Sequence, residues 1–320
     1  YTGSQNLVDP RYFKQDSGVG QWVDAMIRVE GPVVEALAGT FIQDWEIATG
    51  TGYRYFRESR DLECFEHRGN AVTQLVPSGP QPRPLAILQL VLSTIYAARR
   101  ELIITTPYFV PDESVLTALM SAAHSGVEVT LILPEKNDSV LADYASRAVF
   151  DDLLAAGVKI AGFRGGLLHT KAFTVDGEFC LFGSVNLDMR SLWLNFELSL
   201  FVYDVPMTTE IRALQLEYLG SSVMVDEDAR GNLSVTRRFL ENAALAPHGD
   251  GSLELAIEHQ GIERTAHILG RRHLHHLHLA GFRIHFHFGD GGPEGKGAAH
   301  LAEGVVHPLP FHVHIGPVLA

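Results

Sequence analysis

The sequence has few of the features that mark secreted, membrane-spanning or nucleic-acid-binding proteins. Its two cysteines, Cys64 and Cys180, lie far apart and fit no metal-ligand spacing, so we expect reduced thiols in a cytoplasmic environment. No apolar run approaches the roughly 20 residues that a membrane-spanning helix needs. The longest run, residues 85–98, contains polar residues and favours a buried helix. With 25 Lys and Arg against 38 Asp and Glu, the formal charge of −13 argues against a general nucleic-acid binder.

The start of the sequence is also unusual. The first residue is Tyr1 rather than methionine, and no signal peptide follows it. Because Tyr1-Thr2-Gly3-Ser4 resembles the middle of a folded domain, we expect an internal fragment of a longer protein. The 320 residues are 46% hydrophobic, which is enough for one large domain or two smaller ones.

The first quarter of the chain indicates a strand, a helix, a second strand and a linker. Alternating apolar residues predict a strand at 23–29, Gly31-Pro32 marks a turn, and helical spacing follows at 33–45. A short strand is predicted at 72–77. The Pro- and Gly-rich stretch at 77–84 is typical of a linker.

Strands and helices alternate regularly after this linker. The predicted elements are helix 85–100, strand 102–106, helix 112–124, strand 127–133, helix 139–156 and strand 158–161. Gly126 and Gly157 stand where helix C-caps belong, each just before a strand. Such an order predicts an α/β fold with a mostly parallel central sheet flanked by helices.

The most informative segment runs from His169 to Asn186 and has the pattern H-x-K-x4-D-x6-G-S-x-N. Residues two apart in a strand share a face, so His169 and Lys171 should project into one pocket. Short strands at 172–175 and 179–182, joined by a hairpin at Asp176-Gly177, would return Ser184 and Asn186 to that pocket. An isolated H-x-K is often accidental, but the whole pattern is far more demanding.

These residue types suit the cleavage of a phosphodiester without metal. The reaction needs a nucleophile, a proton donor and groups that stabilise the non-bridging oxygens. His169 can serve as nucleophile or proton donor, and Lys171 supplies positive charge. Glu197 could accept a hydrogen bond from the other imidazole nitrogen of His169 and fix its tautomer. Asp176 is counted with the catalytic residues of the motif, although its position in the hairpin turn indicates a structural role.

The pattern has an echo near the start of the chain. The segment 183–187 recurs at residues 3–7, Gly-Ser-Gln-Asn-Leu, with one mismatch. Each copy follows two residues that include an aromatic one, Tyr1-Thr2 and Leu181-Phe182. The echo is consistent with two related domains.

The segment 169–186 resembles the HKD motif of the phospholipase D superfamily. Other segments look like the bacterial cardiolipin synthase family, namely residues 106–113, 136–139, 166–169 and 186–197. The opening, residues 3–24, is similar to the end of that family's first HKD motif, and the similarity covers about residues 1–218.

The resemblance implies a fold with two HKD motifs facing each other across a pseudo-twofold axis, working without metal or cofactor. One histidine would attack phosphatidylglycerol to form a phosphohistidine, and the other would protonate the departing glycerol. A second phosphatidylglycerol would then resolve the intermediate and give cardiolipin. In that scheme His169 is the general acid and base. The nucleophilic first-motif histidine would stand fourteen residues before Gly3, outside this chain.

The resemblance also assigns roles to individual residues. The implied phosphate ligands are Lys171, Ser184, Asn186, Ser4 and Asn6. Asp24 would orient the first-motif histidine as Glu197 orients His169. No metal ligands are implied.

The chain after about residue 219 has a different character. Thirteen of the sixteen histidines lie after residue 240, among Gly-rich stretches without a steady period. We therefore expect a poorly ordered or non-native tail, such as translation out of frame would produce, rather than a defined metal site. The predicted divisions are a remnant of a first phospholipase D-like domain (1–76), a linker (77–84), a second domain with the complete motif (85–218) and the tail (219–320).

The sequence thus predicts a phosphatidyltransferase whose partners are phosphatidylglycerol and the membrane surface. We expect the parent protein to be membrane-anchored by segments absent here and this chain to be peripheral on the cytoplasmic side, with no nucleic-acid partner and with a homo-oligomer possible. The chain alone is not expected to turn over as a monomer. Three alternatives stay open: a homodimeric phosphodiesterase that pairs two His169 residues, a hydrolytic phospholipase or nuclease, and an inactive fragment that binds phospholipid.

Overall fold

The computed structural model describes residues 1–7, 18–50, 65–79, 86–226 and a few positions up to 244, with the backbone of four strands between residues 253 and 288. The chain divides into two compact units, Tyr1–Pro247 and His248–Ala320. Cys180 is a buried free thiol, as expected. Cys64 lies outside the described residues.

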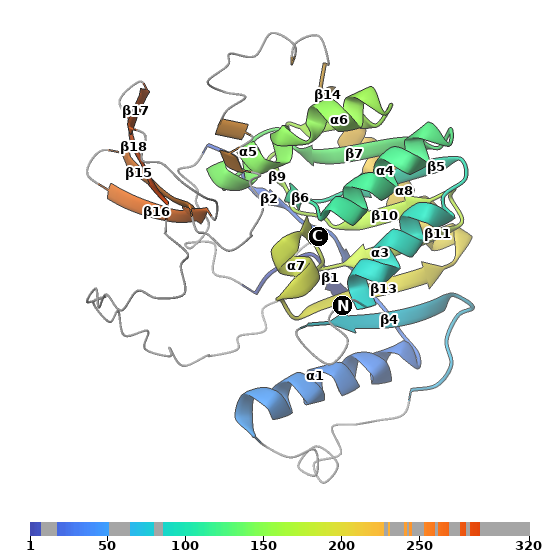
Figure 1. The fold of residues 1–320 in the computed structure, drawn as a ribbon. Coiled ribbons are helices and arrows are strands. Elements are labelled where there is room, and N and C mark those ends of the chain that lie inside the picture. The colour runs from blue at the N-terminus through green and yellow to red at the C-terminus, as the bar shows by residue number, and fades with distance from the viewer. Residues whose placement is uncertain are drawn as a thin grey trace. The chain divides into compact units, whose positions relative to one another are not determined.

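An eight-stranded mixed sheet organises the first unit (Figure 1). Its strands, in spatial order, are β14 (Ser222–Met224), β8 (Lys159–Phe163), β7 (Glu128–Pro134), β5 (Glu101–Thr105), β10 (Ala172–Val175), β11 (Phe179–Gly183), β13 (Glu197–Tyr203) and β4 (Val72–Ser78). The pairs β5–β7 and β7–β8 are parallel, and the other five described pairs are antiparallel. The α/β class is confirmed. The parallel pairing expected from the βαβ order holds for β5, β7 and β8, but the whole sheet is mixed rather than mostly parallel, because the strands of the HKD segment return as antiparallel neighbours.

Helices cover both faces of this sheet (Figure 1). The described helices are α1 (Val33–Thr49), α3 (Ala86–Ala97), α4 (Glu113–His124), α5 (Val140–Ala148), α6 (Phe150–Ala155), α7 (Met189–Trp193) and α8 (Val205–Gly220). Helices α3, α4 and α6 pack on one face, α8 packs on the other, and α1 contacts the edge strand β4. The single helix predicted at 139–156 is divided at Val149, whose backbone (φ −97°, ψ 0°) leaves the helical region.

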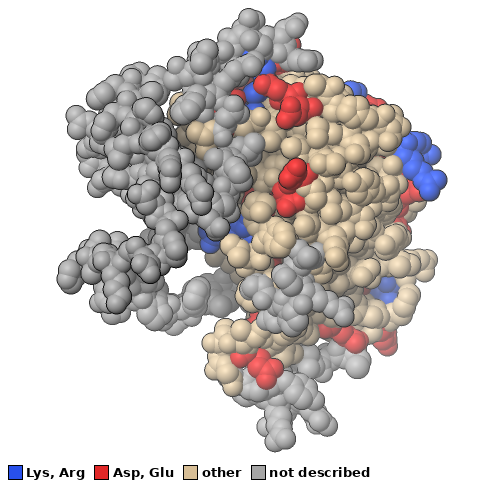
Figure 2. Space-filling view, viewed as in Figure 1, with Lys and Arg blue, Asp and Glu red and all other residues tan. Residues whose placement is uncertain are grey.

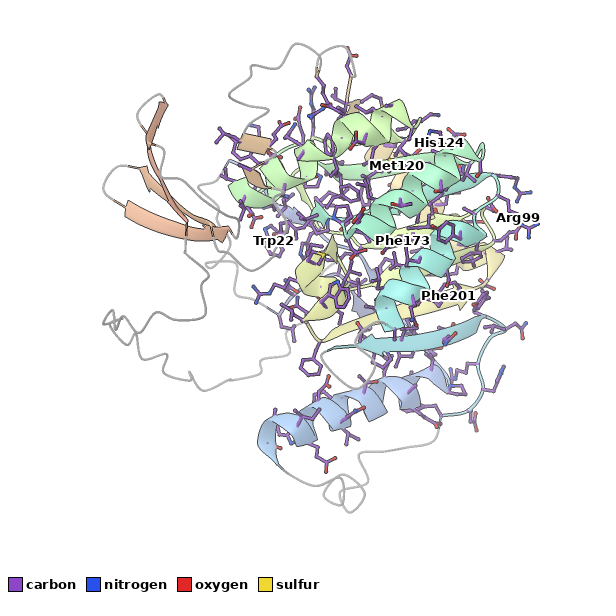
Figure 3. All side chains as sticks on the ribbon, in the orientation of Figure 1. Trp22, Arg99, Met120, His124, Phe173 and Phe201 are labelled. Atoms are coloured by element: carbon purple, nitrogen blue, oxygen red, sulfur yellow. The ribbon has the colours of Figure 1, made fainter. Side chains whose placement is uncertain are left out.

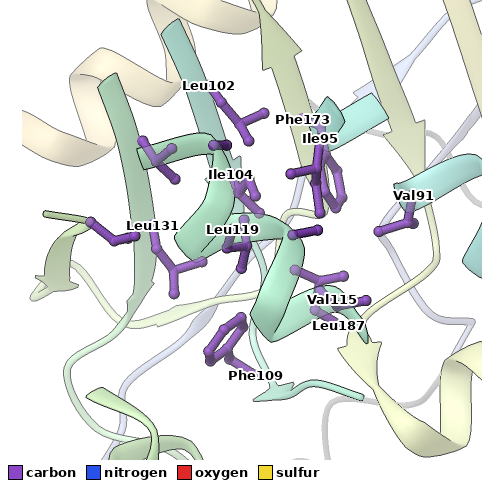
Figure 4. Close-up of a cluster of buried hydrophobic side chains, with 14 of the residues drawn as sticks. Val91, Ile95, Leu102, Ile104, Phe109, Val115, Leu119, Leu131, Phe173 and Leu187 are labelled. Carbon is purple, nitrogen blue, oxygen red and sulfur yellow. The ribbon is translucent and has the colours of Figure 1, made fainter. Parts of the chain in front are cut away.

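Alternation along the strands explains the two-sided core. Leu102, Ile104 and Leu131 face the cluster around α4 (Figure 4). Ile103 and Ile132 point to the opposite face and pack in the cluster that includes Tyr218 of α8. Strands buried on both faces have nearly continuous apolar sequences, which is why the pattern around residues 102–104 and 129–133 is so hydrophobic.

Asp176 holds the hairpin between β10 and β11 in place. Its backbone is left-handed (φ +54°), like that of Gly177 (φ +71°), as the two central residues of a type I′ turn require. The carboxylate accepts hydrogen bonds from the backbone N–H groups of Arg99 (3.0 Å), Arg100 (2.8 Å) and Glu101 (2.8 Å). Arg99 lies at the opposite end of the sheet from Trp22, whose ring contacts His169 (Figure 3). The inclusion of Asp176 among the catalytic residues is therefore corrected: it ties the hairpin to the start of β5.

Replacing Asp176 with alanine should lower the free energy of unfolding by about 2 kcal/mol, because backbone donors lose a charged acceptor and alanine disfavours positive φ. The backbone hydrogen bonds overcome the effect of burial and lower the pKa of this carboxyl below 3.8. The stabilisation is thus present above pH 3.8 and is lost as the pH falls through the folded-state pKa. Urea unfolding at pH 7 and pH 3 checks this. Asp176→Asn, which tolerates the turn, is the matched control and should lose less. Equal losses in both variants would contradict the account.

The remaining strands are short or lie in the second unit. The short described strands are β1 (Thr2–Gly3), β2 (Trp22–Val23), β3 (Met26–Ile27), β6 (Phe109–Val110), β9 (Leu167–Leu168) and β12 (Leu187–Asp188). The second unit contains a four-stranded antiparallel sheet of β15 (Leu253–His259), β16 (Ile262–Ile268), β17 (His276–Leu279) and β18 (Phe282–Phe288).

The tail boundary predicted at 219 is too early, because β14 pairs with β8 in the main sheet.

The surface of the first unit carries scattered charges. On the side seen in Figure 2, isolated acidic and basic side chains are separated by uncharged surface over the described part. Within the described residues we find no helix with both the length and the apolar character that crossing a bilayer requires.

Candidate active site

The HKD histidine lies where two short strands far apart in sequence meet. Strand β9 runs parallel to β2, with Leu167 opposite Trp22 and Leu168 opposite Val23. The backbone N–H of His169 then donates to the carbonyl of Val23 at 2.8 Å. This pairing brings the residue after Val23, Asp24, to the imidazole.

His169 is held at both ring nitrogens. Its Nδ1 lies 2.6 Å from Oδ1 of Asp24, and its Nε2 lies 2.8 Å from Nζ of Lys171. Lys171 also donates to the backbone carbonyl of His169 at 2.7 Å. Because a carboxylate only accepts and an ammonium only donates, this network assigns the proton to Nδ1 and leaves Nε2 as the acceptor. The sequence prediction that His169 and Lys171 share one pocket is confirmed.

Burial shifts the proton affinities of these groups. His169 and Lys171 are 3% and 4% exposed. Burial lowers the pKa of His169, outweighing its hydrogen bond with Asp24. Burial also lowers the pKa of Lys171 to about 7, although the charges of Asp24, Glu197 and Asp188 oppose this. The pKa of Asp24 is lowered, because the hydrogen bonds from His169 and Ser4 and the charge of Lys171 outweigh burial. At neutral pH the imidazole is therefore neutral and Asp24 is ionised.

Two serine–carboxylate pairs repeat the same geometry. The hydroxyl of Ser4 donates to Asp24 at 2.7 Å, and the hydroxyl of Ser184 donates to Glu197 at 2.5 Å. In each pair the serine N–H donates at 3.0 Å to the carbonyl of the residue after the carboxylate. The N–H of that residue donates back to the serine Oγ, at 3.0 Å in the first pair and 2.9 Å in the second. We call these the Ser4–Asp24 and Ser184–Glu197 half-sites.

A glycine precedes the serine in each half-site because the chains approach closely there. A Cβ added to Gly3 would lie 2.3 Å from the carbonyl oxygen of Ala25, and one added to Gly183 would lie 2.3 Å from that of Leu198. Both distances are shorter than any real contact, so only glycine fits. The echo between segments 3–7 and 183–187 is thus a repeat of structure as well as of sequence.

The expected partner of His169 is wrong. We expected Glu197 to orient His169 and Asp24 to orient a different histidine. Instead, Asp24 of the other half-site contacts His169, while Glu197 accepts from Ser184 and from the side-chain amide of Asn195 at 3.1 Å. The reason is the β2–β9 pairing, which a sequence pattern does not reveal.

The predicted phosphate ligands other than Lys171 differ in how deeply they are buried. Ser4 is buried, and Ser184 is half-buried beside Lys171, whose carbonyl accepts from the N–H of Gly183 at 3.3 Å. Asn6 is exposed. The Oδ1 atom of Asn186 is buried and has no hydrogen-bond partner among the residues that the structure describes. The phosphate-binding role of these residues stays a prediction.

Sequence reasoning missed two features of the site. The ring of Trp22 packs on the imidazole of His169, with 4.2 Å between centroids and a tilt of 40°. The hydroxyl of Tyr108 donates to Asp138 at 2.8 Å, and the charge of Asp138 acts on His169. A signal was present for Trp22, because it stands two residues before Asp24 and so shares its face in an extended segment.

A cavity of about 650 Å³ opens beside the Ser184–Glu197 half-site. Leu37 and Phe41 of α1 line one side, and Phe196 lines another. Ser184 and Glu197 both line this cavity, between α1 and the start of β13.

Comparisons with known proteins agree with this site. Residues 91–215 match the family described as "Cardiolipin synthase, PLD-like domain". The chain is 51% identical over 226 residues to Cardiolipin synthase A of Cronobacter sakazakii, covering 71% of this chain and 46% of that protein. It is 47% identical over 241 residues to Cardiolipin synthase A of Pectobacterium carotovorum, covering 75% and 50%. The chain spans about half the length of the curated relatives it matches.

Solved structures are similar at a greater distance. Nuc of Salmonella typhimurium, a phospholipase D family member, is 19% identical with a TM-score of 0.43, over 49% of this chain and 99% of that one. NucT of Helicobacter pylori is 20% identical with a TM-score of 0.42, over 49% and 100%. The motif geometry, the family match and the identity to curated relatives thus agree that residues 91–215 are similar to the phospholipase D-like domain described for cardiolipin synthase.

Proposed function

We propose that this site transfers a phosphatidyl group from one phosphatidylglycerol to another, giving cardiolipin and glycerol. The observation that carries the proposal is the site built from two half-sites, with His169 hydrogen-bonded to Asp24 of one and Lys171 beside Ser184 of the other. The substrate is a lipid of the bilayer, so the site would work at a membrane surface.

The transfer would proceed in two displacements at phosphorus. A second histidine, facing His169, attacks the phosphorus of the first phosphatidylglycerol, and the P–O bond to glycerol breaks while a nitrogen–phosphorus bond forms. His169 acts here as the imidazolium, a form that Asp24 and the negative charge of the bound phosphate stabilise; it gives its Nε2 proton to the departing glycerol oxygen and is left neutral. His169 then takes the proton from a hydroxyl of the second phosphatidylglycerol, whose oxygen attacks phosphorus and breaks the nitrogen–phosphorus bond.

The contacts of His169 would allow it to act as a general acid and as a general base. Its Nε2 is an acceptor in the neutral ring, and protonation of Nε2 produces an imidazolium that Asp24, ionised at 2.6 Å, would stabilise. Lys171, Ser184, Asn186, Ser4 and Asn6 would bind the phosphate oxygens, whose negative charge is spread over several atoms.

Glu197 has a corresponding role for the second histidine. Since Asp24 serves His169 from the opposite half-site, the repeat implies that Glu197 accepts from the imidazole of the histidine facing His169. The cavity beside Ser184 and Glu197 gives such a residue room to approach. A segment with a second His-x-Lys pair would provide it.

The test is an assay with vesicles of phosphatidylglycerol. The two-motif form, defined as this chain with a segment carrying a second His-x-Lys pair joined before Tyr1, should release glycerol and form cardiolipin in equal amounts. This chain alone should form neither. Mass spectrometry of the lipids distinguishes the outcomes. Phosphatidic acid without cardiolipin would instead indicate hydrolysis, and binding of vesicles without any product from the two-motif form would indicate a lipid-binding protein.

Asp24→Asn in the two-motif form should reduce the rate of transfer by about 1,000-fold to 10,000-fold, because the imidazolium of His169 loses its ionised partner. The amide can still accept from Nδ1, so folding should be little affected. Initial rates of glycerol release measure the effect. Asp152→Asn, an exposed carboxylate in the first turn of α6, is the control and should leave the rate unchanged. A loss below tenfold for Asp24→Asn would contradict the assigned pairing.

A further inference from the structure

The residues of the β2 segment contact His169 from several directions. The carbonyl of Val23 accepts from the backbone N–H of His169 at 2.8 Å, and Asp24 binds Nδ1 at 2.6 Å. The indole of Trp22 lies on the imidazole, 4.2 Å between centroids. Figure 3 shows Trp22 at the end of the sheet where β2 and β9 lie. Trp22 and Asp24 are two residues apart in extended backbone, so both side chains face the histidine.

One motion of the imidazole would break both of its hydrogen bonds, to Asp24 and to Lys171. Terminal torsions of histidine are broad and nearly twofold, so the imidazole can turn about its Cβ–Cγ bond. A half turn would carry Nδ1 away from Asp24 and Nε2 away from Lys171. A flat ring in contact with the face of the imidazole obstructs this turn, because the edge of the imidazole would have to pass through the indole.

We propose that Trp22 is a positioning residue that blocks rotation of the His169 ring and so keeps Nδ1 on Asp24 and Nε2 on the side of Lys171, where it would exchange a proton with the substrate oxygen. The importance of this orientation for catalysis rests on the proposed phosphatidyl transfer. The orientation itself can be measured without any reaction, so a failure of one proposal is distinguishable from a failure of the other.

The experiment uses the full 320-residue chain labelled with ¹⁵N-histidine. Two-bond ¹H–¹⁵N correlations at pH 7.5 give the shifts of both ring nitrogens, and His169 is assigned by its disappearance in His169→Gln. In the parent chain we expect one fixed tautomer with the proton on Nδ1. Trp22→Leu fills the space without a flat ring, and Trp22→Phe keeps a flat ring.

In Trp22→Leu the two nitrogen shifts should move toward their mean or broaden, and in Trp22→Phe they should stay near the parent values. Trp45→Leu, which changes the same residue type on α1, is the matched control and should leave His169 unchanged. Circular dichroism confirms that each variant is folded. The proposal is overturned if Trp22→Leu keeps the parent shifts, or if Trp22→Phe and Trp22→Leu change them equally.

Discussion

Replacing His169 with glutamine in the two-motif form should lower the rate of phosphatidyl transfer by about 10,000-fold or more. Loss of a catalytic histidine elsewhere has effects of this size, since nearly the whole chemical step depends on it. Here the departing glycerol oxygen would lose its proton donor, and the second phosphatidylglycerol would lose its base. Initial rates of glycerol release from vesicles, with cardiolipin measured in parallel, provide the test.

The matched control for this change is His124→Gln. His124 is exposed in the last turn of α4, on a helix that packs against the sheet rather than on the HKD segment. We expect the parent rate from that variant. Binding of phosphatidylglycerol vesicles should persist in His169→Gln, because the lysine and serine contacts to phosphate remain. Transfer at near the parent rate in His169→Gln would overturn the assignment of His169.

Replacing Lys171 with methionine should stabilise this chain at neutral pH by a few kcal/mol, because methionine does not carry the cost of burying an ammonium group, and each tenfold loss of proton affinity corresponds to about 1.4 kcal/mol. Lys171 is 4% exposed, and burial lowers its pKa from 10.5 to about 7. Active sites often retain such unfavourable burial because function requires the charge. The gain should appear as a higher midpoint of urea unfolding.

The pH dependence of this gain follows from the two pKa values. Between pH 7 and pH 10.5 the unfolded chain keeps the Lys171 proton that the folded chain has lost, so the parent becomes more stable as the pH rises through this window. The cost of the buried charge is complete below pH 7 and absent above pH 10.5. The advantage of Lys171→Met should therefore be largest at pH 6 and vanish near pH 10.5. Lys136→Met, at an exposed lysine, should show no such trend.

The same substitution should weaken anion binding. A charged hydrogen bond contributes roughly 1.5–3 kcal/mol, so Lys171→Met should reduce sulfate affinity by at least about tenfold. A bound anion favours the ammonium form, so sulfate binding at pH 8 should be accompanied by proton uptake in the parent chain. Calorimetry in buffers of different ionisation enthalpy measures that uptake. Equal stability and equal sulfate affinity in parent and variant would refute the assignment of Lys171 to the phosphate pocket.

Much of the fold was predictable because it depends on local patterns. The strand at 172–175, the turn at Asp176-Gly177 and the strand at 179–182 were all correct within one residue, since period-two alternation and turn chemistry act over short distances. Chain reversals were harder to predict. The antiparallel neighbours of β10 depend on which strands meet in space, so the parallel sheet expected from βαβ order was only partly right.

The candidate site likewise has some features that local sequence patterns predict and others that depend on which strands meet in space. The sequence by itself determined the placement of His169 and Lys171 on one face, because side chains two apart in extended backbone must point together. It also determined the paired Gly-Ser segments, because close chain approach admits only glycine. Only the tertiary structure decided that Asp24 rather than Glu197 binds Nδ1, that Trp22 covers the imidazole and that Asp176 serves the hairpin. Those contacts join residues 75 to 147 positions apart in the chain, and the pairing of β2 with β9, which no local pattern encodes, creates the first two.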